Sequence, residues 1–230
     1  MTGTALVVGG LGSIGSAIGD RLACDGFAVL PTSRSAREGV VGLDVGDPET
    51  HRRAVIAQLP ELDVVVWAQG ANTNDAVGAL DLARSREVIE GNLLFVAETL
   101  DALVATSRLR RGARLVVVSS VWQVVARPGK FSYTVSKAGL GGLVRAAALD
   151  LAAAGVLINA VLPGVVDTPM TRDMLAADQI AAAEAATGFG RLVDLCAVTG
   201  TVAFLCSASN TAVTGQSIAV DLGFSLARSL

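Results

Sequence analysis

The alternation of short apolar runs with helix-patterned segments is the feature of this chain that most restricts its fold. Runs rich in valine and leucine lie at 64–66, 115–118 and 156–162, with helical patterns between them. Strands that are apolar throughout are buried on both faces, which is typical of a parallel sheet covered by helices. The pattern therefore predicts an α/β fold with a doubly wound parallel sheet of about seven strands.

The size of the chain fits one such sheet. Its 230 residues are 52% apolar, which is sufficient for one sizeable core and stays within the range of a single domain. No stretch has the composition of a linker, a repeat or a low-complexity tail. We therefore expect a single domain over residues 1–230.

The charge of the chain excludes several classes of function. A net charge of −3 argues against nucleic acid as a partner, because a binding face would need clustered Lys and Arg. The short cluster of Arg108, Arg110 and Arg111 is placed near the end of a helical segment, where it would complement the negative pole. With one histidine and no CxxC pair, no metal site is expected. No signal-like or membrane-length apolar segment is visible, so we expect a cytoplasmic protein.

A glycine-rich turn follows the first apolar run, Ala5–Val8. Gly10, Gly12 and Gly15 fit the spacing GxGxxG, and a helical pattern begins directly after them. Glycine allows a tight turn and lets the backbone approach a pyrophosphate, which the positive end of the next helix attracts. The turn predicts a dinucleotide-phosphate site, although a merely flexible glycine loop is the simpler alternative.

Ser120, Tyr133 and Lys137 are spaced so that one carbonyl group could meet all three side chains. Tyr133 and Lys137 lie four residues apart in a helical pattern, which places both on one face. Ser120 follows a predicted strand that would deliver its hydroxyl to the carboxyl edge of the sheet. An ammonium group favours the phenolate, so we expect a lowered pKa for Tyr133 and a general acid/base role. The same spacing also occurs by chance in many helices.

Three further motifs join the glycine turn and this polar set. They are Asp44 after a third predicted strand, Asn92 in a mid-chain helix, and the run Asn159–Met170, which reads NAVLPGVVDTPM. In this order, the five motifs resemble those of the short-chain dehydrogenase/reductase family in its compact, single-domain form. The resemblance covers nearly the whole chain and implies a Rossmann fold that binds a nicotinamide dinucleotide.

The resemblance also implies a role for each side chain. Tyr133 would be the catalytic acid/base, Ser120 would hold the substrate oxygen, and Lys137 would bind the nicotinamide ribose while lowering the pKa of Tyr133. Asn92 would anchor a proton relay, or would only hydrogen-bond a local backbone group. The residues implied to bind the cofactor are Gly9, Gly12, Ser13, Ile14, Gly15, Ser33, Arg34, Asp44, Val45, Gly70, Tyr133, Lys137, Pro163, Gly164, Val166 and Thr168. For Thr168, the alternative is a helix cap.

Two motifs depart from the pattern of the compact family. Ser13 stands where a middle glycine is usual, so that Gly9, Gly12 and Gly15 read instead as the GxxGxxG turn of the extended branch. We expect cofactor binding to be retained, since Ser13 can contact phosphate through its hydroxyl or its backbone. The four residues Trp67–Gly70 stand in place of the NNAG motif of the family and keep only its glycine.

The end of the second predicted strand favours NADP(H) over NAD(H). An acidic residue there would bind the ribose 2′-hydroxyl and repel a 2′-phosphate, but residues 28–34 contain none. Ser33 takes that position, and the guanidinium of Arg34 could pair with a 2′-phosphate or be an ordinary solvated charge. Arg37 could equally be the partner of that phosphate. Asp44 and Val45 would contact the adenine ring, unless the Asp44 carboxylate only caps the following loop.

Substrate specificity is expected in two segments, 121–131 and about 165–190, the second acting as a loop or lid. The predicted substrate contacts are Trp122, Gln123, Met170 and Met174, which indicate an apolar pocket with few polar points. Methionines at helical spacing could equally be packing residues of the lid.

The leading interpretation is an oxidoreductase that transfers a hydride between NADP(H) and a carbonyl group of a small, fairly apolar substrate, with ketone reduction as the expected direction. The extended-type turn keeps a redox-neutral, epimerase-like enzyme open as an alternative. Ser13 and the altered NNAG motif keep open a catalytically silent nucleotide-binding regulator or scaffold. By the resemblance, we also expect a homo-oligomer, either a tetramer or a dimer.

Overall fold

A seven-stranded parallel β-sheet forms the centre of the molecule in the computed structural model, which describes residues 3–226. Its strands are β1 (Thr4–Val8), β2 (Ala28–Ser33), β3 (Val41–Gly42), β4 (Leu62–Trp67), β5 (Leu109–Val118), β6 (Leu157–Pro163) and β9 (Ser217–Val220). They lie in the order β3-β2-β1-β4-β5-β6-β9, so the chain leaves β1 first to one side and then to the other. This topology confirms the doubly wound sheet predicted from the sequence.

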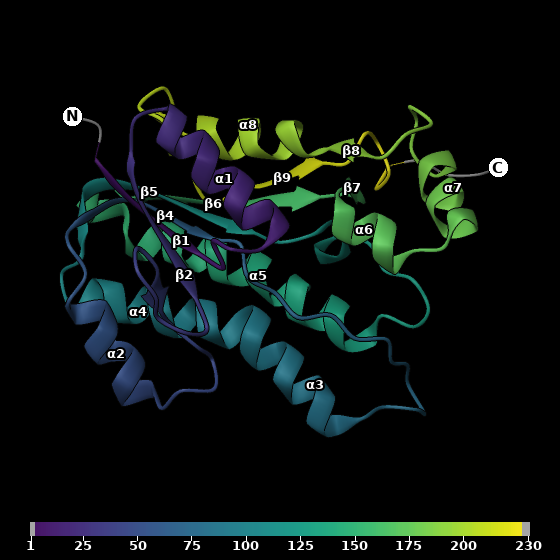
Figure 1. Ribbon diagram of the computed structural model, residues 1–230, viewed down its shortest axis with the longest axis horizontal. Coiled ribbons are helices and arrows are strands. Elements are labelled where there is room, and N and C mark those ends of the chain that lie inside the picture. Colours follow the sequence, from purple (N-terminus) through teal and green to yellow (C-terminus); the bar gives the residue numbers. More distant parts are fainter. Residues whose placement is uncertain (1–2, 227–230) are drawn as a thin grey trace.

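Helices cover both faces of this sheet (Figure 1). On one face lie α1 (Ser13–Cys24) and α8 (Leu195–Cys206), and on the other lie α2 (Glu49–Ala57), α3 (Leu82–Ile89), α4 (Phe95–Ala105) and α5 (Phe131–Asp150). Two short helices, α6 (Pro169–Met174) and α7 (Ala177–Ala185), lie beside a separate two-stranded sheet of β7 (Val166–Asp167) and β8 (Val193–Asp194). No helix within residues 3–226 is long and apolar enough to cross a membrane.

Each face of the sheet has its own apolar core. Strand β1 contributes to both cores, which explains why it is apolar at every position. Leu6 and Val8 pack into the cluster under α4 and α5, while Ala5 and Val7 pack into the cluster under α1 and α8. Successive side chains of a strand point to opposite faces, so a strand covered on both sides needs apolar residues at every position.

The short arginine cluster is divided between a helix end and a strand. Arg108 lies just after α4 and donates to the carbonyl oxygen of Thr106, which caps that helix, so the sequence prediction holds for Arg108 and is wrong for Arg110 and Arg111. Helix α4 ends at Ala105, and Arg110 and Arg111 lie in the first half of β5. The backbone causes this, because Leu62 of β4 pairs with Leu109 and draws this segment into the sheet. The Arg110 guanidinium lies 3.5 Å from Glu61, so an acidic neighbour on the surface accounts for part of the cluster.

Candidate active site

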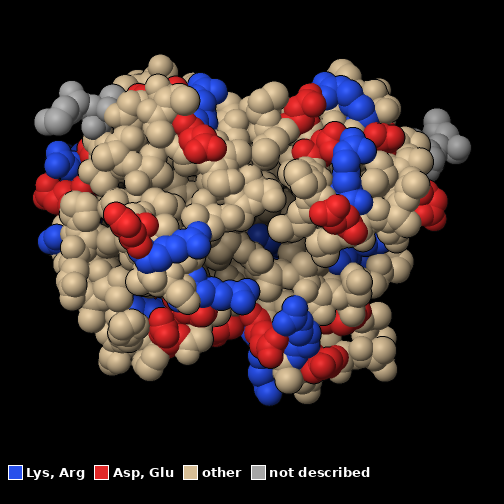
Figure 2. Space-filling view, viewed as in Figure 1, with Lys and Arg blue, Asp and Glu red and all other residues tan. Residues whose placement is uncertain are grey.

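The carboxyl ends of the strands surround a cleft of about 700 Å³. Its walls come from the segments that follow β1, β2, β3, β4, β5 and β6, together with the start of α5 and with α6. Figure 2 shows the hollow near the centre of the face in view, with mostly uncharged surface above it and charged side chains along its lower edge. This edge is where doubly wound sheets bind ligands, since the connections from β1 diverge to either side there.

The glycine turn after β1 is sterically fixed. Gly9 has a φ of +75°, and a Cβ added to it would lie 2.7 Å from the backbone nitrogen of Gln69. A Cβ on Gly15 would lie 2.2 Å from the carbonyl oxygen of Gly9, whereas one on Gly12 would meet nothing closer than 3.5 Å. A freely flexible loop would not need glycine in this way. Behind the turn, Ser13 and Ile14 begin α1 and line the cleft, so the positive end of the helix faces it.

Ser120, Tyr133 and Lys137 come together in this cleft. Ser120 lies two residues after the end of β5, and Tyr133 lies in the first turn of α5. Hydrogen bonding links their side chains. The Lys137 Nζ lies 5.7 Å from the centre of the Tyr133 ring and donates to the carbonyl oxygen of Val118 at 3.5 Å. The fold thus brings the predicted serine, phenol and amine to the same part of the cleft.

The pKa values of this set differ from the sequence expectation. Burial raises the pKa of Tyr133, and the hydrogen bond with Ser120 only partly opposes it. Burial also lowers the pKa of Lys137 to about 8. The predicted lowering of the Tyr133 pKa by Lys137 is therefore wrong for the protein alone, because loss of hydration disfavours the charged forms of both groups.

Asn92 lies behind the cleft, in a single π-helical turn (Glu90–Leu94) that separates α3 from α4. Its side-chain amide accepts from the Ala71 backbone nitrogen at 2.7 Å and donates to the Ala71 carbonyl oxygen at 2.9 Å and to the Ser136 hydroxyl at 2.9 Å. A Cβ on Gly70 would lie 3.4 Å from Asn92 and 3.6 Å from the Lys137 Nζ. Asn92 therefore holds the chain after β4 close to Lys137.

The segments after β2 and β3 bring four predicted cofactor residues to one end of the cleft, namely Ser33, Arg34, Asp44 and Val45. The Ser33 hydroxyl donates to the Ser35 carbonyl oxygen at 2.7 Å. Within residues 3–226, Arg34 takes part in no ion pair with an acidic side chain. The Asp44 carboxylate accepts from the Gly46 backbone nitrogen at 3.0 Å, so it does cap its own loop while it lines the cleft.

The segments after β5 and β6 form the opposite wall of the cleft. Its lining includes Trp122, Pro163, Gly164, Val166, Thr168, Met170 and Met174. The Thr168 hydroxyl also caps α6, since it accepts from the Thr171 backbone nitrogen at 3.1 Å. Gln123 lies elsewhere, because its amide nitrogen donates to the Ser217 hydroxyl on β9 at 2.7 Å. The predicted substrate contact of Gln123 is therefore not supported by its position, and Gly15 likewise does not line the cleft.

Trp67 shows how the chain replaces an asparagine of the NNAG motif. Its ring is buried in the core, and the indole nitrogen donates to the Thr99 hydroxyl of α4 at 2.8 Å. Sequence reasoning missed Leu11, Gln69 and Asn72 as lining residues of the cleft. The signal that could have found them was their position, since each lies within or next to a turn already assigned to the site.

Comparison with known proteins identifies this arrangement. The model of a family described as "Enoyl-(Acyl carrier protein) reductase" matches residues 10–225. The chain belongs to the short-chain dehydrogenase/reductase family. Members of this family are oxidoreductases that use a nicotinamide cofactor on small-molecule substrates, and the present dehydrogenase/reductase is an enzyme of this kind.

The curated relatives of this short-chain dehydrogenase/reductase include reductases that match almost end to end. The 3-oxoacyl-[acyl-carrier-protein] reductase FabG of Escherichia coli is 30% identical over 235 residues, covering 95% of this chain and 96% of the relative. The FabG of Staphylococcus aureus is 31% identical and covers 97% and 98%. A putative gluconate dehydrogenase from Agrobacterium tumefaciens has a similar solved structure, with a TM-score of 0.89, 26% identity and coverage of 98% and 96%. Actinorhodin polyketide ketoreductase with NADPH has a TM-score of 0.88, 25% identity and 98% coverage of both chains.

Proposed function

We propose that this enzyme transfers a hydride between NADP(H) and the carbonyl carbon of a small, fairly apolar ketone, with Tyr133 as the general acid/base. The observation that carries the proposal is the meeting of Ser120, Tyr133 and Lys137 in one cleft beside the glycine turn. When bound, the nicotinamide supplies the hydride, and the protein supplies position and proton transfer.

The proton chemistry follows from the environment of each side chain. The Ser120 hydroxyl holds the carbonyl oxygen, and the Tyr133 phenol donates a proton to that oxygen as negative charge develops on it. Tyr133 is protonated at neutral pH, as a phenol with an ordinary or a raised pKa is, and this is the form that a proton donor needs. The ammonium of Lys137, 5.7 Å from the ring centre, stabilises the phenolate that remains after proton transfer.

The cofactor is expected to lie along the glycine turn, with its adenosine half toward the segments after β2 and β3. A preference for NADP(H) is supported by Arg34, which lines that end without an acidic partner among residues 3–226. It is also supported by the similar ketoreductase, whose solved structure contains NADPH.

The substrate is expected to lie between Tyr133 and the wall formed by Trp122, Met170 and Met174. This wall is largely apolar, and the segment 165–190, with α6 and α7, is proposed as its loop or lid. Because the FabG relatives are named 3-oxoacyl-[acyl-carrier-protein] reductases, a 3-oxoacyl compound belongs in any panel of trial ketones.

We also infer that the enzyme is a cytoplasmic homo-oligomer, a dimer or a tetramer. Val135 and Leu149 are exposed on α5, and Leu94 is exposed just before α4. Large apolar side chains on neighbouring helices suit contact with a second subunit.

The variant Tyr133→Phe tests the proposed chemistry. It removes the phenolic proton and keeps the ring, so ketone-dependent NADPH oxidation should fall by at least about a hundredfold while the Kd for NADPH changes little. Both quantities can be measured on the same protein, by absorbance and by fluorescence titration. Oxidation at the wild-type rate by this variant would contradict the assignment of Tyr133.

A further inference from the structure

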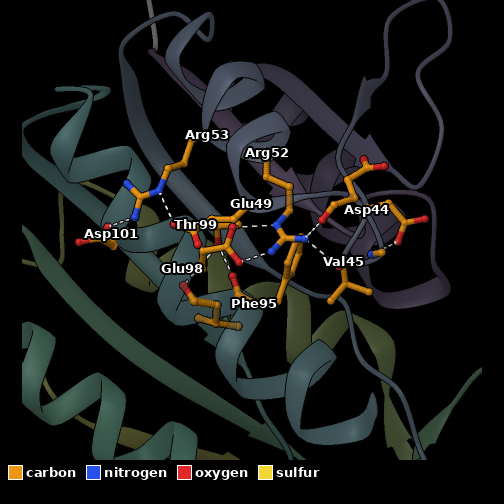
Figure 3. Close-up of polar contacts among 12 residues, drawn as sticks. Asp44, Val45, Glu49, Arg52, Arg53, Phe95, Glu98, Thr99 and Asp101 are labelled. Atoms are coloured by element: carbon orange, nitrogen blue, oxygen red, sulfur yellow. Dashed lines mark hydrogen bonds and ion pairs between the residues drawn. The ribbon is translucent and has the colours of Figure 1, made fainter. Parts of the chain in front are cut away.

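Arg52 on α2 is a buried arginine that none of the sequence motifs includes. Its guanidinium makes a two-pronged contact with the carboxylate of Glu98 on α4, with Nε donating to Oε1 at 2.7 Å (Figure 3). From the same group, Nη1 donates to the carbonyl oxygen of Val45 at 2.7 Å and also to that of Asp47. The guanidinium lies 5.8 Å from the centre of the Phe95 ring. One side chain thus joins two helices to the loop after β3.

That loop forms one end of the cleft. Asp44 and Val45 both line the cleft, as does Phe95 of α4. Internal hydrogen bonds give the loop its turn, since Gly46 and Asp47 both donate backbone N–H groups to Asp44. Arg52 supplies the additional attachment of this turn to the body of the molecule.

The neighbouring residue Arg53 shows that joining the two helices does not require a buried charge. Arg53 also connects α2 to α4, through an ion pair with Asp101 at 2.5 Å, and it contacts Glu49 at 2.8 Å. Its side chain is 38% exposed, against 7% for Arg52. Burying a charged pair carries a desolvation cost that a pair of apolar side chains in the same place would avoid. What Arg52 adds is its contact with the loop.

We propose that Arg52 is a positioning residue for the adenine end of the nucleotide site, because it fixes the carbonyl group of Val45 and with it the two residues that face the adenine ring. The proposal rests on the proposed binding of a nicotinamide dinucleotide in this cleft. Arg52 does not line the cleft, so its effect on binding would pass through the loop at 44–47.

A double variant isolates this effect. Arg52→Met together with Glu98→Met removes both buried charges and leaves neither one unpaired, so the fold is expected to be retained. Arg53→Met is the matched control, since it breaks an α2–α4 ion pair and leaves the loop contact in place. Glu98→Gln leaves the Arg52 charge buried without its ionic partner and is expected to lower stability, but in the folded protein Arg52 can still donate to Val45, so this variant is a second control for binding. If the double variant does not fold, Arg52→Lys replaces it, since one ammonium cannot span both Glu98 and Val45 as the guanidinium does.

Binding is measured by fluorescence titration with NADPH, with ADP as an adenine-half probe and with reduced nicotinamide mononucleotide, which lacks the adenosine. The double variant should weaken NADPH and ADP binding by about five- to tenfold, leave the mononucleotide unaffected, and keep kcat at saturating NADPH. Both control variants should resemble the wild type. Wild-type affinity for NADPH in the folded variant, or an equal loss for the mononucleotide, would overturn the proposal.

The outcomes for this residue and for the proposed reaction are separable. A wild-type protein that binds NADPH but reduces no ketone would refute the proposed reductase activity. The role of Arg52 in binding would still be decided by the same titrations of the double variant. A wild-type protein that binds neither NADPH nor ADP would refute both proposals.

Discussion

Tyr133 is the only tyrosine of the chain, so the ultraviolet absorbance of its phenolate follows one residue alone. Free tyrosine titrates near pH ~10. Because burial raises the pKa of the Tyr133 phenol, the protein without ligand should titrate above that value. Ser120→Ala should move the midpoint higher still, since hydrogen bonding with Ser120 lowers the pKa. A midpoint below that of free tyrosine, in protein that remains folded by circular dichroism, would mean that the charge of Lys137 outweighs burial.

Lys137 is expected to destabilise the fold at neutral pH. Its pKa is about 8 in the folded protein and 10.5 for an unperturbed lysine, so between these values the unfolded chain binds the extra proton and stability rises with pH. Below pH 8, the full penalty for burying the ammonium applies. Lys137→Met should therefore raise the free energy of unfolding at pH 7, by on the order of 3 kcal/mol, with a gain that shrinks toward pH 10.

Urea denaturation of the wild type and of Lys137→Met at both pH values measures this difference directly. Groups that titrate equally in both proteins cancel in the comparison. A variant that is less stable than the wild type at pH 7 would show that contacts such as the one with the Val118 carbonyl outweigh the cost of the buried charge.

At the scale of single residues, the sequence predicted which side chains meet in the site better than it predicted how buried those side chains are. Spacing placed Ser120, Tyr133 and Lys137 together, since a strand end and one helix face are local features. It could not give the direction of the Tyr133 pKa shift, because burial depends on the segments that close over the ring. It also could not show that Gln123, one residue after Trp122, turns toward β9.

Among the elements, the glycine turn makes a sharp prediction about stability. Gly15→Ala would place a Cβ 2.2 Å from a backbone oxygen that cannot move without distorting the turn, so it should lower the free energy of unfolding by about 1–3 kcal/mol. Gly12→Ala, whose Cβ would meet nothing closer than 3.5 Å, is the matched control and should keep wild-type stability. Thermal unfolding of the two variants compares them, and equal melting temperatures would contradict the geometry of the turn.

Elements defined by their own residues were predictable, whereas those defined by pairing were not. The apolar runs that became β4 and the second half of β5 needed no other information. The first half of β5 is a strand because it pairs with Leu62, although its arginines read as a helix end. The π-helical turn at Asn92 has no local signature either, since its side chain bonds the distant Ala71 and Ser136.

For the molecule as a whole, the doubly wound parallel sheet and the position of the cleft followed from the alternation of elements and from the motif after β1. The contacts that attach the cleft to the rest of the protein could not be predicted in this way. Arg52 and Glu98 lie 46 residues apart and belong to no motif, so only the packing of α2 against α4 brings them to the loop at 44–47.

The central claim is that this enzyme moves a hydride from NADPH to a carbonyl carbon, and an isotope measurement tests it most directly. NADPH carrying deuterium at the transferable C4 position is incubated with the protein and a panel of ketones that includes a 3-oxoacyl compound. We predict an alcohol product with deuterium on the former carbonyl carbon, formed by the wild type and not by Tyr133→Phe. Bound NADPH that keeps its deuterium across the whole panel would contradict the claim.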